Sequence, residues 1–167
     1  MSNTVYLKSM PFGSPGVRSR PHEQTCEPQI VSKTNPPLLY GAPVKMVAGY
    51  ATAIAASDAA TVVYGFLVRP WPAQDTTWGP TTAFGLATPP TTGTCDILKR
   101  GYMLVKVGAG VAAAQGVVYM RVATPAAGKP IGGIEAVADG ANTVIVANAY
   151  FMTAADENGV AEIAYNL

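Results

Sequence analysis

The chain has 167 residues, of which 49% are hydrophobic and only 13% are charged, and its formal net charge is +1. A net charge this small provides no long-range field for nucleic acid or for an anionic membrane surface, so we expect no direct binding to either. A charged fraction of about half the usual ~25% favours a protein that works within an assembly, although an ordinary domain rich in small residues would also fit.

The first 38 residues are rich in proline and show no regular apolar period. Their six prolines remove backbone donors and fix φ, which excludes a long helix and a central strand. We expect residues 1–38 to form an extended, mildly basic arm that is ordered by what it touches. At roughly 3.3 Å per residue it could reach on the order of 100 Å, far enough to contact a neighbouring subunit. A disordered tail is the alternative, but several apolar residues argue against it: Val5, Tyr6, Leu7, Met10, Phe12, Ile30 and Val31.

Residues 39–167 alternate short apolar runs with Gly, Ala and Pro. This pattern predicts an all-β fold, an antiparallel sandwich or barrel, because no window holds a sustained helical stripe. The stretch 95–107 is either a strand pair or one long strand bent at Gly101, and 71–93 is a long loop rich in Thr, Pro and Gly. The Asn158-Gly159 and Asp139-Gly140 pairs predict hairpin tips. The other expected strands are 44–47, a weaker one at 51–55, 62–69, 117–123, 131–137, 143–152 and 160–166.

Two parts of the chain resemble each other weakly. Residues 41–47 resemble 116–122, and residues 56–63 resemble 138–145, with a few residues inserted between the two matches. A duplicated β unit would explain this, and so would coincidence in a chain biased toward Ala, Val and Thr. Two copies are too few for a solenoid.

The sequence lacks the groups that catalysis requires. His22, the only histidine, lies in the Pro-rich arm, and neither Cys26 nor Cys95 has a base or a CxxC partner nearby. We therefore expect no catalytic, cofactor or metal site. We expect both cysteines to be free thiols, and a disulfide between Cys26 and Cys95 is the alternative. The N-terminus has no apolar run typical of a signal peptide, and no stretch is long enough to span a membrane.

Two aromatic residues stand out in the long loop. Trp71 and Trp78 lie among Pro and Thr residues, close to Asp75, and such a group could bind a sugar or a partner protein. It could equally hold the loop against its own core. A carbohydrate-binding or host-attachment β-module is therefore the alternative function.

A set of short segments in a fixed order resembles the structural cement proteins, also called head-decoration proteins, of tailed bacteriophages. No segment is specific alone, and the ordered set together with the Pro-rich arm carries the resemblance. It covers roughly residues 39–167, through LYGAPV at 39–44, GFLVRPWP at 65–72, KRGYMLV at 99–105, GVVYMR at 116–121, IGG at 131–133, AYF at 149–151 and GVAEI at 159–163.

The resemblance implies a jelly-roll-like β domain on the outer surface of a phage head. Such proteins bridge neighbouring major capsid proteins, often as homodimers and sometimes as trimers, and reinforce the shell against internal DNA pressure. This chain would then be a non-enzymatic virion protein without a cofactor, made in the host cytoplasm. We expect its contacts with the shell or with a second subunit to involve Tyr6, Leu7, Met10, Phe12, Arg18, Arg20, Ile30, Val31, Trp71 and Trp78.

Overall fold

The structure is a computed structural model that describes residues 13–20, 22–70 and 88–167. Within these residues the chain forms nine strands and two short 3-10 turns, and no α-helix. The prediction of an all-β sandwich or barrel is therefore confirmed. The elements are β1 (Thr25–Ile30), β2 (Pro43–Val47), β3 (Tyr50–Ala53), η1 (Ala60–Val62), β4 (Gly65–Leu67), β5 (Thr94–Lys106), β6 (Val117–Arg121), β7 (Ile134–Glu135), η2 (Gly140–Asn142), β8 (Thr143–Phe151) and β9 (Val160–Tyr165).

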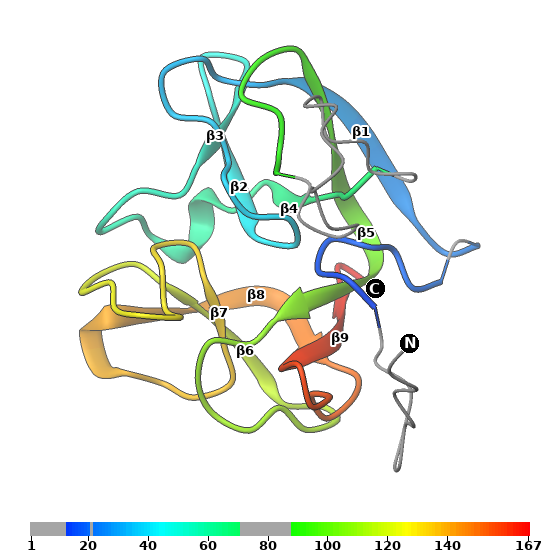
Figure 1. Ribbon diagram of the computed structural model, residues 1–167, viewed down its shortest axis with the longest axis vertical. Coiled ribbons are helices and arrows are strands. Elements are labelled where there is room, and N and C mark those ends of the chain that lie inside the picture. Colours follow the sequence, from blue (N-terminus) through cyan, green and yellow to red (C-terminus); the bar gives the residue numbers. More distant parts are fainter. Residues whose placement is uncertain (1–12, 21, 71–87) are drawn as a thin grey trace, which may run out of the picture.

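Strand β5 is shared by two β lobes (Figure 1). The sheet runs in the order β3-β2-β4-β5-β9-β8-β6-β7, and β1 pairs with β5 outside this path. Residues 94–100 of β5 pair with β1 and β4, whereas residues 101–106 pair with β9. We call β1–β4 with residues 94–100 the first lobe, and β6–β9 with residues 101–106 the second lobe.

Gly101 marks the point where β5 passes from one lobe to the other. Its φ of +129° lies in a region that L side chains rarely adopt. A Cβ at this position would lie 2.8 Å from the Cβ of Gln24 and 2.9 Å from the carbonyl oxygen of Glu23. The stretch 95–107 is thus one long strand bent at a glycine, the second of the two forms that its sequence allowed.

The two lobes have the same topology. The first lobe has the strand order β3-β2-β4-β5-β1, and the second has the order β7-β6-β8-β9-β5. A parallel bridge closes each lobe, from Val31 to Ala51 in the first and from Val107 to Ile134 in the second. In each lobe a 3-10 turn precedes the strand that is fourth in chain order: η1 precedes β4, and η2 precedes β8.

The registers of the two lobes agree as well. Glu27 lies four residues before the bridge residue Val31, and Met103 lies four residues before the bridge residue Val107. Glu27 pairs with Ile97 and Met103 pairs with Ile163, so these two pairs occupy equivalent places in the two lobes. Coincidence in composition would not reproduce pairing order, closing bridge and register together. The two lobes therefore repeat one β unit, as the weak internal resemblance suggested. The pairs Met46–Ala51 and Met120–Ile134 make Met46 equivalent to Met120, one residue away from the alignment of 41–47 with 116–122.

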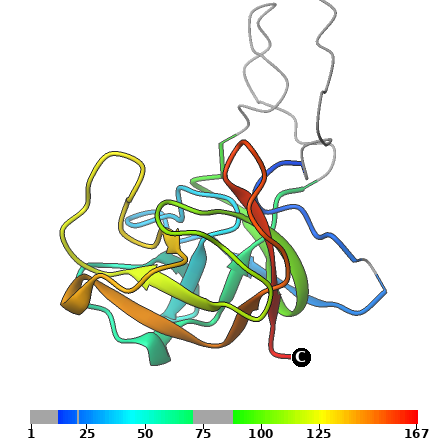
Figure 2. The ribbon, with the colours of Figure 1, turned by 90° about the horizontal axis from the view of Figure 1, so that it is seen from below.

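Alternating strand residues build the hydrophobic core. The interior of the first lobe holds Val31, Val44, Ala51, Leu67, Cys95 and Ile97. The interior of the second lobe continues into residues on the facing side of the first lobe, so one apolar cluster joins both lobes. Phe66 and Tyr165 meet across this junction edge to face, with ring centroids 5.0 Å apart. Seen from below, the strands of the second lobe curl around their interior, and the loop between β6 and β7 projects from it (Figure 2).

Three local predictions differ from the structure. Of the expected strand 62–69 only β4 forms, after the η1 turn, and of 131–137 only β7 forms, because a turn at Pro130–Gly133 precedes it. Asp139-Gly140 begins η2 and is not a hairpin tip, since β7 pairs with β6 rather than with β8. Asn158-Gly159 does lie in the turn between β8 and β9, where Gly159 has a φ of +67°.

The described part of residues 1–38 is bound to its own chain. Residues 13–20 lie along β5, where the amide of Gly16 donates to the carbonyl of Leu104 (2.7 Å) and the amide of Leu104 donates to the carbonyl of Val17 (2.9 Å). Farther along, β1 pairs with β5 on one side only, as an edge strand that contains a proline can do. The prediction that this segment forms no central strand holds, but β1 itself was not predicted.

Candidate functional site

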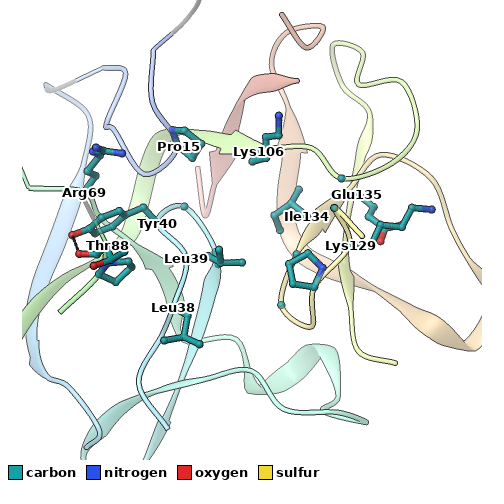
Figure 3. A pocket seen from close by; sticks show the side chains of 18 of the residues that line it. Pro15, Leu38, Leu39, Tyr40, Arg69, Thr88, Lys106, Lys129, Ile134 and Glu135 are labelled. Carbon is teal, nitrogen blue, oxygen red and sulfur yellow. Dashed lines mark hydrogen bonds between the residues drawn. The ribbon is translucent and has the colours of Figure 1, made fainter. Parts of the chain in front are cut away.

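An open groove of about 650 Å³ lies between the two lobes (Figure 3). Residues 38–42 of the first lobe form one wall, together with Arg69 and the segment 88–89. Lys106 and the segment 126–135 of the second lobe form the other wall. The two walls are connected through β5, which both lobes share, and through the apolar cluster that joins the lobes.

Two leucines face this groove. Leu38 and Leu39 are 66% and 42% exposed, large values for leucine, and they follow two prolines that keep the chain extended. Tyr40 anchors the wall beside them, because its hydroxyl donates to the carbonyl of Thr88 (3.1 Å) and its ring lies under the Arg69 guanidinium. Burial raises the pKa of Tyr40, and Arg69 opposes this shift. The leucines are thus presented to solvent by a fixed backbone.

The opposite wall is built on a tight turn. The amide of Gly133 donates to the carbonyl of Pro130 (2.9 Å), and the amide of Gly132 donates to the carbonyl of Arg121 (2.8 Å). Gly132 has a φ of +77°, which explains the glycine at this position. Figure 3 shows Ile134 across the groove from the leucines, although its side chain is only 3% exposed; the exposed apolar surface of this wall comes from Pro130, which also lines the groove.

The groove is positively charged. Arg69, Lys106 and Lys129 are among its lining residues, and in the described part of the chain the only lining carboxylate is that of Glu135. Both oxygens of Glu135 accept hydrogen bonds from Arg121, which is shared with Asp139, so these three side chains together carry one net negative charge. Lys106 also donates to the carbonyl of Asn158, but the three lining cations outnumber this one negative charge, so the groove has a positive excess.

A buried ion cluster supports the second wall. The Arg121 side chain is only 2% exposed and lies between Glu135, which is 1% exposed, and Asp139. Its guanidinium also donates to the carbonyls of Ala123 (3.2 Å) and Thr124 (3.1 Å), at the start of the loop that reaches the groove. Hydrogen bonds to Glu135 and then Asp139 raise the pKa of Arg121, so this guanidinium keeps its positive charge, while the cluster of one cation and two carboxylates carries one net negative charge.

The same contact makes stability depend on pH. A hydrogen bond from Arg121, assisted by Asn142, holds the pKa of Asp139 below its ordinary value. The contribution of the Arg121–Asp139 contact to the free energy of unfolding is therefore fully present above the pKa of Asp139 in the unfolded chain, about 3.9. This contribution is lost as pH falls through the lower pKa of Asp139 in the folded protein. We expect Asp139→Asn to be less stable than wild type at pH 7, with a difference that shrinks below about pH 4. Urea unfolding from pH 7 to 3 measures this, with Glu157→Gln as an exposed control, and a difference independent of pH would contradict it.

A second apolar surface lies on the first lobe. Ile30, Val47 and Tyr50 are 54%, 49% and 47% exposed. Val47 pairs directly with Tyr50, and the bridge from Val31 to Ala51 brings Ile30 beside Tyr50, so the three side chains share one outer face. We call this surface the outer stripe. It lies apart from the groove, since none of its residues lines the groove.

The predicted contact residues differ in how exposed they are and in what they bind. Arg18 is exposed and Ile30 belongs to the outer stripe, so both are accessible. Arg20 forms a bidentate ion pair with Glu162 of its own chain, where its Nη2 lies 2.8 Å from Oε2. Val31 was wrong as a contact residue: it is 1% exposed because it points into the first lobe, where the parallel bridge to Ala51 closes the sheet. Tyr6, Leu7, Met10, Phe12, Trp71 and Trp78 lie outside the described residues.

Sequence reasoning missed the residues that define the groove. Leu38, Leu39 and Lys129 belong to no strand pattern, and the walls come from segments far apart in the chain. A usable signal did exist, since the segments that carry the resemblance to cement proteins meet here through Tyr40, Gly41, Arg69, Gly132 and Gly133.

The thiols and acids do not form a reactive centre in the described residues. Burial, together with the nearby Asp96, raises the pKa of the Cys95 thiol to about 11, so Cys95 stays protonated near neutral pH. Burial also raises the pKa of Cys26. In residues 13–20, 22–70 and 88–167, no three His, Cys, Asp or Glu residues are grouped to hold a metal ion, and no helix could cross a membrane.

Comparison with known proteins gives matches over nearly the whole chain. The family described as "XM1 gp53 minor capsid protein" matches residues 3–165. A solved chain from "The capsid of Myoviridae Phage XM1" superposes with a TM-score of 0.66 at 18% identity, over 99% of this chain and 97% of that chain. At this identity the superposition establishes a shared fold. No curated protein matches the chain.

Proposed function

Because the chain belongs to the XM1 gp53 minor capsid protein family, we propose that it is a non-enzymatic cement protein that staples neighbouring major capsid proteins on a phage head. The observation that carries the proposal is the family match over residues 3–165, which includes both lobes and the segment before them. The family is one of phage capsid proteins, so a structural role in the virion follows from membership. The more specific proposal, that the protein staples neighbouring subunits, is argued from the arrangement of its surfaces.

The geometry supports stapling because one molecule offers two separate surfaces with exposed apolar side chains. The groove lies between the lobes, and the outer stripe of Ile30, Val47 and Tyr50 lies on the first lobe alone. A protein with two such surfaces can contact two neighbouring subunits at once. Repeated contacts of modest strength then give high avidity on a shell.

We also propose that the protein sits on the outer face of the head and acts as a homodimer, with a trimer as the alternative. Large side chains exposed on a weakly charged molecule favour association with other proteins. Sedimentation of the free protein at tens of micromolar is expected to show a dimer or trimer. A monomer at that concentration would remove self-association from the proposal and leave binding to the shell.

The decisive experiment is cosedimentation of the purified protein with expanded shells that lack it, followed by cryo-electron microscopy. We expect saturable binding, and density on the outer surface that touches at least two major capsid subunits. Density on one subunit only would contradict stapling, and density inside the shell would contradict the outer position. Absence of binding to the cognate shell would overturn the proposal. Binding to a glycan array would then support the host-attachment module instead.

A further inference from the structure

We propose that the groove between the lobes binds an extended segment of the major capsid protein that carries apolar side chains flanked by Asp or Glu. The identity of the partner, the major capsid protein, rests on the proposed function. The chemistry of the bound segment is inferred from the residues that line the groove. It gives the groove the specific role of recognising an acidic, apolar peptide.

Apolar complementarity comes from both walls. Leu38 and Leu39 remain largely exposed although the wall that carries them is well anchored through Tyr40. Pro130, an exposed residue of the opposite wall, adds apolar surface beside Ile134, which is itself almost fully buried. Apolar side chains of an incoming segment would bury these surfaces, and burial of apolar area is the main driving force of association.

Charge complementarity selects an acidic segment. Arg69, Lys106 and Lys129 line the groove, and the Glu135 carboxylate is already bound by Arg121. A segment rich in Lys or Arg would meet only like charges. Residues 1–12 of this chain contain Lys8 and no Asp or Glu, so the N-terminus of a second copy fits poorly.

Comparison of the two lobes shows what distinguishes the wall that the second lobe contributes to the groove. Lys106 and Gly133 directly precede the two residues of the closing bridge there, Val107 and Ile134. The equivalent residues of the first lobe are Ile30 and Tyr50, which are bulky and uncharged. The two lobes thus differ at matching surface positions, with an apolar pair in the first lobe and a cation beside a glycine in the second. The second lobe therefore adds a positive charge and no bulky side chain at this part of its wall.

An open groove fits a peptide better than a small solute. Sites for small molecules usually enclose most of their ligand. Here the walls are open to solvent and run along the backbone of residues 38–42 and 130–133, so an extended chain gains more contact than a compact one. The partner of a capsid protein is also most directly another capsid protein.

The test is binding of full-length variants to undecorated shells at several salt concentrations. We expect the double variant Lys106→Gln, Lys129→Gln to bind roughly tenfold more weakly than wild type and to depend less on salt, because two charge contacts are lost. We expect Leu38→Ser, Leu39→Ser to bind at least roughly tenfold more weakly, because apolar contacts are lost. The matched controls are Lys33→Gln and Val111→Ser, whose side chains are exposed and do not line the groove. Thermal unfolding verifies that each variant folds.

A photo-crosslinking residue in place of Leu39 then identifies the occupant. Crosslinks to a segment of the major capsid protein that contains apolar residues and Asp or Glu would support the inference. Crosslinks to a basic segment or to a second copy of this chain would overturn it. Groove variants that bind shells as tightly as wild type would also overturn the inference about the groove, but they would leave the proposed function intact. If wild type itself does not bind shells, the proposed function fails first.

Discussion

Replacing Arg121 with methionine is expected to lower the free energy of unfolding by about 3–5 kcal/mol, because it leaves buried Glu135 without its partner. Arg121 is 2% exposed and Glu135 is 1% exposed, so water cannot replace the lost guanidinium. The carbonyls of Ala123 and Thr124 would lose a donor as well. Urea unfolding followed by circular dichroism measures the change.

Two further variants test the physical reason. Arg121→Met combined with Glu135→Leu should recover much of the loss, since a buried ion pair replaced as a unit by apolar side chains is often neutral. Arg100→Met removes an exposed arginine and should change stability by no more than about 0.5 kcal/mol. If Arg121→Met cost no more than this control, the buried cluster would not stabilise the second lobe.

Replacing Gly101 with alanine is the second change for which we expect a large loss, at least about 2 kcal/mol. Two effects add: the residue has a φ of +129°, and its new Cβ would lie 2.8 Å from the Cβ of Gln24. The strain falls where β5 leaves one lobe and enters the other, so we expect both lobes to lose stability together. Hydrogen exchange of amides on β1 and β9 would report on each lobe.

Gly93→Ala separates backbone strain from the clash. Gly93 also has a positive φ of +85°, but a Cβ there would meet no atom within 4 Å. We expect this control to cost less than Gly101→Ala, by the amount that the contact with Gln24 and Glu23 contributes. Equal costs would mean that the close approach at Gly101 is unimportant.

The fold class was predictable because strand periodicity is local. Residues 44–47, 117–121 and 160–165 alternate or cluster apolar side chains over the length of one strand, and each forms a strand. β1 was missed because Pro28 argues against a strand, and that argument fails for an edge strand with a partner on one side only. The strand at 62–69 was overestimated, because Val62 to Tyr64 belong to η1 and the turn after it.

The candidate site was less predictable, because it depends on contacts between distant segments. Nothing near Val31 in the sequence shows that its side chain points into a closed lobe, since the closing partner, Ala51, is twenty residues away. Leu38 and Lys129 come together only after both lobes have folded. The faint internal resemblance pointed to β2 and β6 as equivalent strands, but it aligned them one residue out of register, and only the strand pairing gives the correct equivalence.

The bonding of β5 has a mechanical consequence. Along residues 94–100 this strand is held by β1 and β4, and along residues 101–106 by β9 and the segment 13–19. These hydrogen bonds run across the strand. A pull along β5 that drew the lobes apart would load many of them in shear, so that they must break together, whereas a pull across the strand would peel them one at a time. If the protein staples neighbouring subunits as proposed, it would resist best when β5 lies along the direction in which those subunits are pulled apart.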